Sequence, residues 1–426
     1  MTSLLGNNVR YLYQMGKLNV RAVLVAAALC SSLTISAVNV TDDGVTYNPL
    51  QTAIPSLSIA PDAVGGGMGD VGAATKSDNM SQYWNPAKYV QAESNGGFSI
   101  SYTPWLRKIV NDIDLVYLSG YYKPTDRTAI GASFRYFSMG EITLTGQPTY
   151  SGEPANLGTA KPYEFAVDGS FSMLLSEYWS AGVALRFIFS DLFNGVLDED
   201  GYSSAKAVGA DIAFSYRRPI QIASNTSYLG VGMSISNIGN KVSYDNDQTQ
   251  QFIPTNFRLG TSFDYAFDEF NRLQFAIDMN KLLVPTPYGN SDQYATPEEF
   301  NEAVREYEET TSIGGIFKSL GDAPDGFREE LREINLSFGL EYSYDKKFMV
   351  RGGYFNENKY KGNRKYFSVG AGFNLSIFQL SAAYVIAVAQ NSPLDKTLRF
   401  SLGFDLGGLK NIFGVNADNG ASNSDN

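Results

Sequence analysis

Apolar and polar residues alternate along most of the chain with a period of two. The clearest run is residues 336–344, where Leu336, Phe338, Leu340, Tyr342 and Tyr344 alternate with Ser337, Gly339, Glu341 and Ser343. Successive side chains of a β-strand point to opposite faces of the sheet. The pattern therefore predicts strands with one apolar face and one polar face.

About fourteen segments of this kind follow one another, and most are about ten residues long, as a tilted membrane-spanning strand requires. They begin near Phe98, Asp112, Ala129, Pro162, Trp179, Ala205, Leu229, Asn256, Leu273, Ile334, Met349, Phe367, Gln379 and Leu398. An even number of strands closes with both chain ends on one side. We predict an all-β fold, a 14-stranded antiparallel transmembrane β-barrel over residues 97–407.

The links between these segments alternate between short and long, which is typical of outer-membrane barrels with short periplasmic turns and longer external loops. The short links are 123–128, 176–178, 268–272, 345–347 and 376–378, and the long ones are 138–161, 190–204, 237–255, 285–333 and 356–365. One link on the periplasmic side, 217–227, is longer than this rule expects. A soluble sandwich would not predict the alternation.

This sidedness places residues 38–96, which lack alternation, in the periplasm or inside the lumen as a plug. The link 285–333 is expected to be external and to contain a helix over 297–309, since Pro297 stands at its start and acidic residues fill the first turn. A structured loop of this length is more often functional than idle.

The composition of the chain limits the catalytic and binding sites that it can form. The chain has 27 Tyr, 27 Phe and 41 Gly but no histidine, so the usual general base and the commonest zinc ligand are absent. We expect no enzymatic activity and no cofactor. The formal net charge of -11 argues against nucleic acid as a partner.

The N-terminus resembles a signal peptide over residues 1–37. Lys17 and Arg21 precede an apolar stretch at 22–35, and a small-residue site predicts cleavage after Ala37. Met15 is an alternative start, and a membrane anchor is the alternative for the apolar stretch. Cys30, the only cysteine, would leave with this peptide, and Leu29 before it does not favour lipidation.

Two motifs invite a ligand interpretation. Residues 67–72, Gly-Met-Gly-Asp-Val-Gly, match the dinucleotide-binding fingerprint, but no strand and helix flank them convincingly, so close backbone packing is the better interpretation. Acidic runs at 198–201 and 245–247 suggest calcium without the full spacing of a calcium loop. Solvated loop tips are the better interpretation.

The segment 53–89 carries a more specific resemblance. Its runs Ala-Ile-Pro-Ser-Leu-Ser-Ile-Ala-Pro-Asp-Ala at 53–63, Gly-Gly-Met-Gly-Asp-Val-Gly-Ala-Ala at 66–74 and Ser-Gln-Tyr-Trp-Asn-Pro-Ala-Lys at 81–88 resemble the PorV family of the type IX secretion system. That family is similar to fatty-acid transporter barrels, which have fourteen strands, a plug and the Asn-Pro-Ala motif matched here at 85–87.

The resemblance implies an outer-membrane component that binds the C-terminal signal domains of secreted cargo at the translocon SprA and delivers them to the sortase PorU. Lipid and lipopolysaccharide are the implied surroundings. Val64 stands where the family is expected to have arginine, which leaves a PorV/PorQ-type paralogue open. The polar tail, 408–426, lacks a terminal aromatic residue.

We select two groups of candidate site residues. The plug motif comprises Gly67, Gly69, Asp70, Gly72, Trp84, Asn85 and Pro86, and the candidate cargo-binding residues of the external loop are Tyr288, Tyr294, Phe300, Tyr307, Phe317 and Phe327. Two alternatives to the secretion role remain. One is a transporter of fatty acids or other hydrophobic molecules, which predicts an apolar lumen, and the other is a lipopolysaccharide deacylase, which the missing histidine disfavours.

Overall fold

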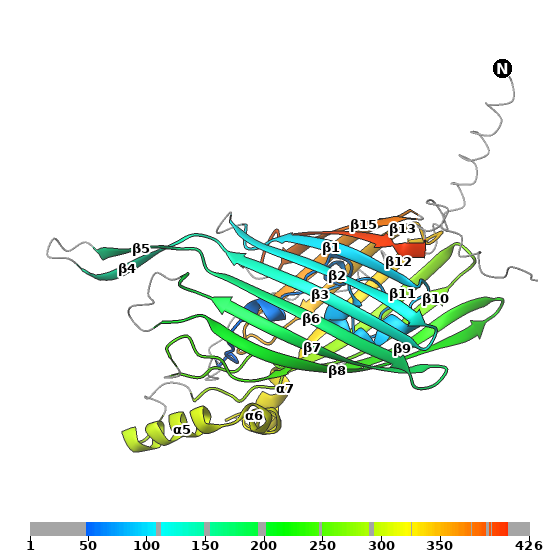
Figure 1. Cartoon of the computed structure of the whole chain (residues 1–426). Coiled ribbons are helices and arrows are strands. Elements are labelled where there is room, and N and C mark those ends of the chain that lie inside the picture. The colour runs from blue at the N-terminus through cyan, green and yellow to red at the C-terminus, as the bar shows by residue number, and fades with distance from the viewer. Residues whose placement is uncertain are drawn as a thin grey trace, which may run out of the picture. The chain divides into compact units, whose positions relative to one another are not determined.

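Fourteen antiparallel strands close into one barrel in the computed structural model, as the alternation predicts (Figure 1). The structure describes residues 48–407 except 108–111, 149–153, 195–201, 247–248, 289–293, 325, 376, 389–391 and 393. The signal peptide, Cys30, the acidic run at 198–201 and the tail at 408–426 lie outside the described residues. The first strand pairs with the last, with Gly97 opposite Asp405 and Tyr102 opposite Phe400, and this pairing closes the barrel.

The barrel strands are β1 (Gly96–Pro104), β2 (Ile113–Thr125), β3 (Thr128–Met139), β6 (Tyr163–Leu174), β7 (Trp179–Asp191), β8 (Ala205–Ile222), β9 (Asn225–Gly239), β10 (Asn256–Ala266), β11 (Asn271–Leu282), β12 (Asn335–Tyr344), β13 (Phe348–Asn356), β14 (Lys365–Asn374), β15 (Phe378–Ala387) and β16 (Leu398–Asp405). Each contains or lies within four residues of a predicted segment start. The barrel prediction is therefore confirmed.

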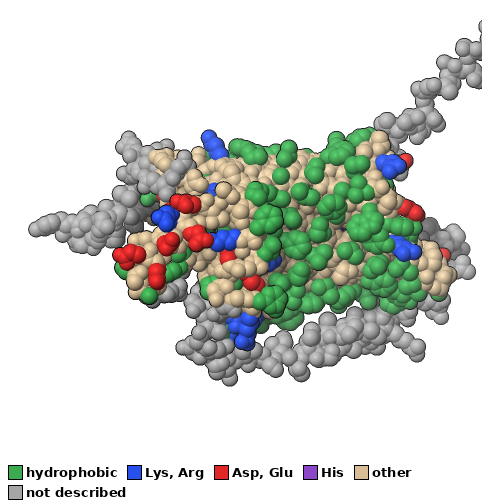
Figure 2. Space-filling model, turned by 90° about the horizontal axis from the view of Figure 1, so that it is seen from below, with side chains coloured by type: hydrophobic (Ala, Val, Ile, Leu, Met, Phe, Trp, Pro, Cys, Tyr) green, Lys and Arg blue, Asp and Glu red, His purple; other side chains and the backbone are tan. Residues whose placement is uncertain are grey.

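The polar face of the strands points into the barrel. In β16, Leu398 and Phe400 are exposed on the outside, while Arg399 and Ser401 are buried inside. Apolar side chains accordingly form a broad band around the visible outer surface (Figure 2). The buried charged residues of the strands include Glu164, Asp168, Arg258, Asp264 and Arg399.

Short turns lie at one end of the barrel and long loops at the other, which we call the turn end and the loop end. The expectation of a long link at 217–227 was wrong. Strands β8 and β9 continue to pair until Ile222 lies opposite Asn225, so only Ala223 and Ser224 form the turn. The two strands extend past their neighbours as a hairpin.

The loop end holds the irregular elements. The predicted helix is present as α5 (Pro297–Glu309), where the Thr296 hydroxyl accepts the backbone N–H of Glu299. Three features were not predicted, namely α6 (Ser312–Lys318), α7 (Phe327–Arg332) and a separate hairpin of β4 (Ile142–Pro148) with β5 (Pro154–Ala160). Among the described residues, no helix is long and apolar enough to span a membrane.

Residues 48–95 run through the lumen from the loop end to the turn end. At the loop end, Ala53 donates its N–H to the carbonyl of Phe252, and at the turn end the N–H of Lys123 reaches the carbonyl of Asn95. Between these points lie η1 (Pro55–Ser58), α3 (Ala63–Gly67), α4 (Ser81–Trp84) and η2 (Pro86–Gln91). The described part of the expected plug segment, 48–95, lies in the lumen.

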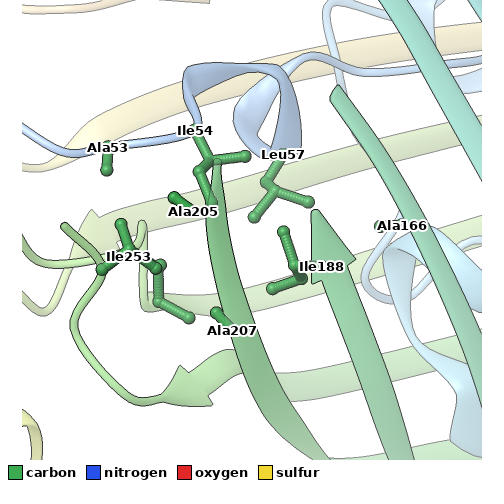
Figure 3. Packing of buried hydrophobic residues seen from close by; sticks show 9 residues of the cluster. Ala53, Ile54, Leu57, Ala166, Ile188, Ala205, Ala207 and Ile253 are labelled. Atoms are coloured by element: carbon green, nitrogen blue, oxygen red, sulfur yellow. The ribbon is translucent and has the colours of Figure 1, made fainter. Parts of the chain in front are cut away.

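An apolar cluster fixes the first part of this lumenal segment to the wall. Ile54 and Leu57 pack against Ile188 of β7 and Ile253 of the β9–β10 loop, together with smaller alanines (Figure 3). Because Ile54 and Leu57 are almost fully buried there, their burial stabilises the seated segment by about 1.5–3 kcal/mol for each side chain.

Candidate functional site

The predicted plug motif lies in the lumen, where Asp62 joins its two halves. The Asp62 carboxylate accepts the backbone N–H groups of Val64 and Gly65 at 2.8 Å, which caps α3. Its other oxygen accepts the indole N–H of Trp84 at 2.7 Å. Because the buried carboxylate of Asp62 caps α3 and also binds the indole of Trp84, it holds α3 against α4.

Glycine is required where Trp84 meets the backbone. A Cβ atom on Gly72 would lie 2.2 Å from the Trp84 ring, and one on Gly65 would lie 2.4 Å from it. Residues 67–72 begin at the last residue of α3 and do not open a helix. This geometry supports close packing and does not offer the helix N-terminus that a dinucleotide pyrophosphate needs.

Wall residues bind the rest of the motif directly. Asp278 of β11 accepts the N–H groups of Gly72 and Ala73 with one oxygen, both at 2.8 Å, and the Ser368 hydroxyl accepts the N–H of Gly69 at 2.8 Å. Asp70, which has a left-handed backbone with φ of 63°, accepts Arg399 at 2.6 Å. These partners come from β11, β14 and β16.

Asn85 and Pro86 make the turn into η2. The Asn85 amide donates to the carbonyls of Ala73 and Phe214 at 2.9 Å each, and its oxygen accepts the N–H of Ala87. Pro86 occupies the first position of η2, where the missing N–H costs no hydrogen bond. All seven motif residues thus lie at the interface between the lumenal segment and the wall.

Buried charges complete this interface. Arg186 lies between Asp168 and Asp211, with nitrogen–oxygen distances of 2.9 Å to each, and Asp168 also accepts Gln82 of α4 at 2.6 Å. The guanidinium of Arg258 stacks 4.7 Å from the centre of the Trp84 ring. Since buried charges destabilise a fold unless they are paired, these contacts favour one seated arrangement of the segment.

Two of the cavities among the described residues lie on opposite sides of the plug motif. The cavity at the turn end has a volume of about 320 Å³ and includes Arg217, Arg272 and Glu341 in its lining. The cavity at the loop end has about 90 Å³ and includes Arg135, Asp168 and Arg258. Both linings mix charged and aromatic side chains.

The external loop contains the second group of predicted residues, and four of these six pack against one another. Tyr288 stands edge-to-face against Phe300 and Tyr307, with ring centres 5.7 and 5.6 Å apart, and Tyr294 stands against Phe300 at 5.5 Å. Burial in this cluster raises the pKa of Tyr307 to about 12. These four side chains hold α5 onto the loop.

The other two predicted residues, Phe317 and Phe327, point into solvent. They are 72% and 77% exposed, more than any other large apolar side chain that the structure describes. Ile313, Leu320 and Leu331 are also exposed on α6, α7 and the link between them. Sequence reasoning missed these three, although Ile313 with Phe317 and Phe327 with Leu331 have the i, i+4 spacing of one helix face.

Buried ion pairs fasten α7 to the barrel mouth. The Lys281 ammonium, at the end of β11, lies 2.9 Å from Glu330 and 2.5 Å from Glu333. Lys361, in the β13–β14 loop, lies 2.5 Å from Glu329 and 3.0 Å from Glu333. Ion pairs of the carboxylates in and directly after α7 therefore fix the position of this helix.

Comparison with known proteins identifies the family to which the chain belongs. A family model described as the type IX secretion system protein PorV matches residues 43–289, which is more than half of the chain. No curated protein matches the chain.

Solved structures with a similar fold include two toluene transporters and a FadL homologue. The toluene transporter TodX of Pseudomonas putida shares 12% identity, with a TM-score of 0.48, and covers 84% of this chain and 99% of its own. The toluene transporter TbuX of Ralstonia pickettii shares 12%, with a TM-score of 0.42 and coverages of 80% and 96%. A FadL homologue of Pseudomonas aeruginosa shares 10%, with a TM-score of 0.40 and coverages of 84% and 100%. At these identities the likeness concerns the fold and carries no ligand over.

Proposed function

The chain belongs to the PorV family of type IX secretion system proteins, an outer-membrane component of that system, and from this premise we propose that it is a cargo receptor. In this role it binds the C-terminal signal domains of secreted proteins at the translocon SprA. It then delivers them to the sortase PorU for attachment to the cell surface. The loop 285–333 is the binding element.

The observation that carries the proposal is the occupied lumen. Residues 48–95 run through it, and the wall holds them through buried hydrogen bonds such as those that Asp278 accepts from Gly72 and Ala73. A protein cargo has no route through a lumen in this state. The barrel therefore acts beside a separate translocon and offers its external surface to the cargo.

The form of the loop supports contact through side chains. Strand addition needs an exposed backbone edge, whereas the described part of 285–333 folds into α5, α6 and α7, whose backbone groups are largely bonded within helices. Phe317 and Phe327 are the predicted binding residues that remain free to meet a partner. Apolar contact is the binding mode we adopt.

The transporter alternative lacks a supporting observation. It requires an apolar internal pocket, and the cavities of about 320 and 90 Å³ are instead lined by several arginines and carboxylates. The deacylase alternative requires an activated nucleophile, and histidine does not occur in the chain. We expect no enzymatic activity.

The test is an affinity purification from detergent-solubilised outer membranes. One variant replaces residues 288–320 with a short Gly/Ser linker, which retains α7 and its ion pairs to Lys281 and Lys361. A control variant shortens another external element, the β4–β5 hairpin. Recovery of the translocon and signal-domain cargo by the native chain and the control, with loss in the 288–320 variant, supports the receptor role. A barrel that brings down only lipid would favour the transporter.

A further inference from the structure

Helix α7 has its charged and apolar faces in the opposite places from those of an ordinary surface helix. Its acidic residues Glu329 and Glu330 are buried against the barrel mouth, whereas its apolar residues Phe327 and Leu331 are exposed. A surface helix normally does the reverse, because burial of apolar area stabilises a fold and burial of charge does not. Within the part of the chain that the structure describes, Phe327 and Leu331 therefore stay largely exposed.

Helix α6 has the same outward orientation for a steric reason. It packs through Gly315, where a Cβ atom would meet Phe252 at 2.8 Å and Pro285 at 3.1 Å. Only a residue without a side chain fits this contact, and two apolar residues of α6, Ile313 and Phe317, remain outside. Leu320 follows directly and is also exposed.

The neighbouring helix α5 is strongly acidic. It contains six glutamates and one arginine, and Glu306 binds Lys318 of α6 at 2.7 Å, which fixes α5 beside α6. The hydrogen bond and the charge of the Lys318 ammonium lower the pKa of Glu306. Lys318, Arg328 and Arg332 of α6 and α7 are basic, but the six glutamates of α5 outnumber them and leave an excess of negative charge beside the apolar surface. Such a border is electrostatically complementary to a basic partner.

The charge distinguishes between possible occupants. Helices that lie in a membrane interface carry lysine and arginine on their polar face, opposite to the composition of α5. A second copy of the chain would bring a second acidic α5 toward the first. Neither a lipid surface nor a second copy fits as well as a protein segment that carries positive charge.

We propose that Ile313, Phe317, Leu320, Phe327 and Leu331 form a docking surface, the α6–α7 face, for a segment of the secreted partner that combines apolar anchors with lysine or arginine. The inference rests on the proposed receptor role and adds the chemistry of the partner. The two phenylalanines supply the anchors, and α5 supplies the charge that orients the segment.

The experiment measures binding of a purified cargo signal domain to the full-length barrel in lipid nanodiscs, at low and high salt. Phe317→Ser with Phe327→Ser is expected to weaken binding about 10- to 100-fold, as loss of interface anchors does. Glu298→Lys with Glu302→Lys and Glu309→Lys is expected to weaken binding and to remove most of its salt dependence. Phe270→Ser, an exposed phenylalanine at the turn end, is the matched control and should bind as the native chain does.

The outcomes separate this inference from the proposed function. If the double phenylalanine variant binds normally while replacement of 288–320 abolishes binding, the α6–α7 face is not the docking surface and the receptor role stands. If replacement of 288–320 also leaves binding intact, the receptor role of the loop itself is refuted. Phe317→Trp keeps a large apolar group in place, and quenching of its fluorescence by brominated lipid, without cargo, would identify lipid as the occupant and overturn the inference.

Discussion

Replacement of Asp278 by alanine should unseat the lumenal segment without breaking the barrel wall. One carboxylate oxygen of this fully buried residue accepts two N–H groups, from Gly72 and Ala73, both at 2.8 Å. A hydrogen bond to a charged group contributes about 1.5–3 kcal/mol, and water entering the space left by the carboxylate restores part of it. We expect the seated state to lose about 2–4 kcal/mol, which corresponds to a roughly 30- to 700-fold larger population of the unseated state.

Hydrogen exchange in nanodiscs measures this population at the amides of Gly72 and Ala73. The matched control is Ser337→Ala, because Ser337 lies directly opposite Asp278 in the strand register and its buried hydroxyl makes no hydrogen bond to the described residues. Ser337→Ala should exchange at the native rate. Native exchange in Asp278→Ala would refute the view that this carboxylate holds the segment, and accelerated exchange across β11 would show that the wall itself had been damaged.

Three further predictions follow from the same packing. Gly353→Ala places a Cβ atom 2.0 Å from Met68 of the lumenal segment, whereas the neighbouring Gly352→Ala meets open space, so only the first should lower the melting temperature, with a cost of about 1–3 kcal/mol. Glu333→Gln removes the charge shared by Lys281 and Lys361 and should destabilise the seated α7 by about 3 kcal/mol, seen as faster hydrogen exchange over 327–332 with unchanged exchange in the strands. Phe300→Ala breaks the ring contacts with Tyr288 and Tyr294 and should loosen α5 by about 1–2 kcal/mol, and equal protease sensitivity of the variant and the native loop would contradict this.

The barrel was predictable because two different environments act on each strand. Lipid requires apolar side chains on the outside, and the lumenal segment requires polar ones inside, so the alternation is strong enough to mark strand starts such as Asn256 and Leu398 at the observed residue. Helix α5 was predictable for a local reason, since Thr296, Pro297 and the following glutamates carry the start signal within a few positions.

The candidate sites were less predictable because their contacts are distant in sequence. Asp278 holds Gly72 across 206 positions, and no local pattern in either segment indicates the pairing. Similarly, a surface helix at 327–332 would ordinarily bury its apolar residues Phe327 and Leu331. Lysines from β11 and the β13–β14 loop reverse that orientation by pairing with Glu329 and Glu330. For the same reason, the sequence could not separate packed aromatics such as Tyr307 from free ones such as Phe317.

Binding of a partner to the external loop 285–333 should leave the lumenal segment in place. The free energy of partner binding is too small to displace this segment from the barrel wall. The wall bonds of Ser180, Ser262, Asp278, Ser368 and Ser401, with the Arg399–Asp70 ion pair, together hold the lumenal segment by on the order of 10 kcal/mol. A nanomolar partner supplies about 12 kcal/mol in total, so a partner that opened the lumen would retain almost no affinity. We therefore expect the barrel in a planar bilayer to remain non-conducting when a signal domain binds outside. Channel opening on binding would mean that the wall bonds are far weaker than their geometry implies.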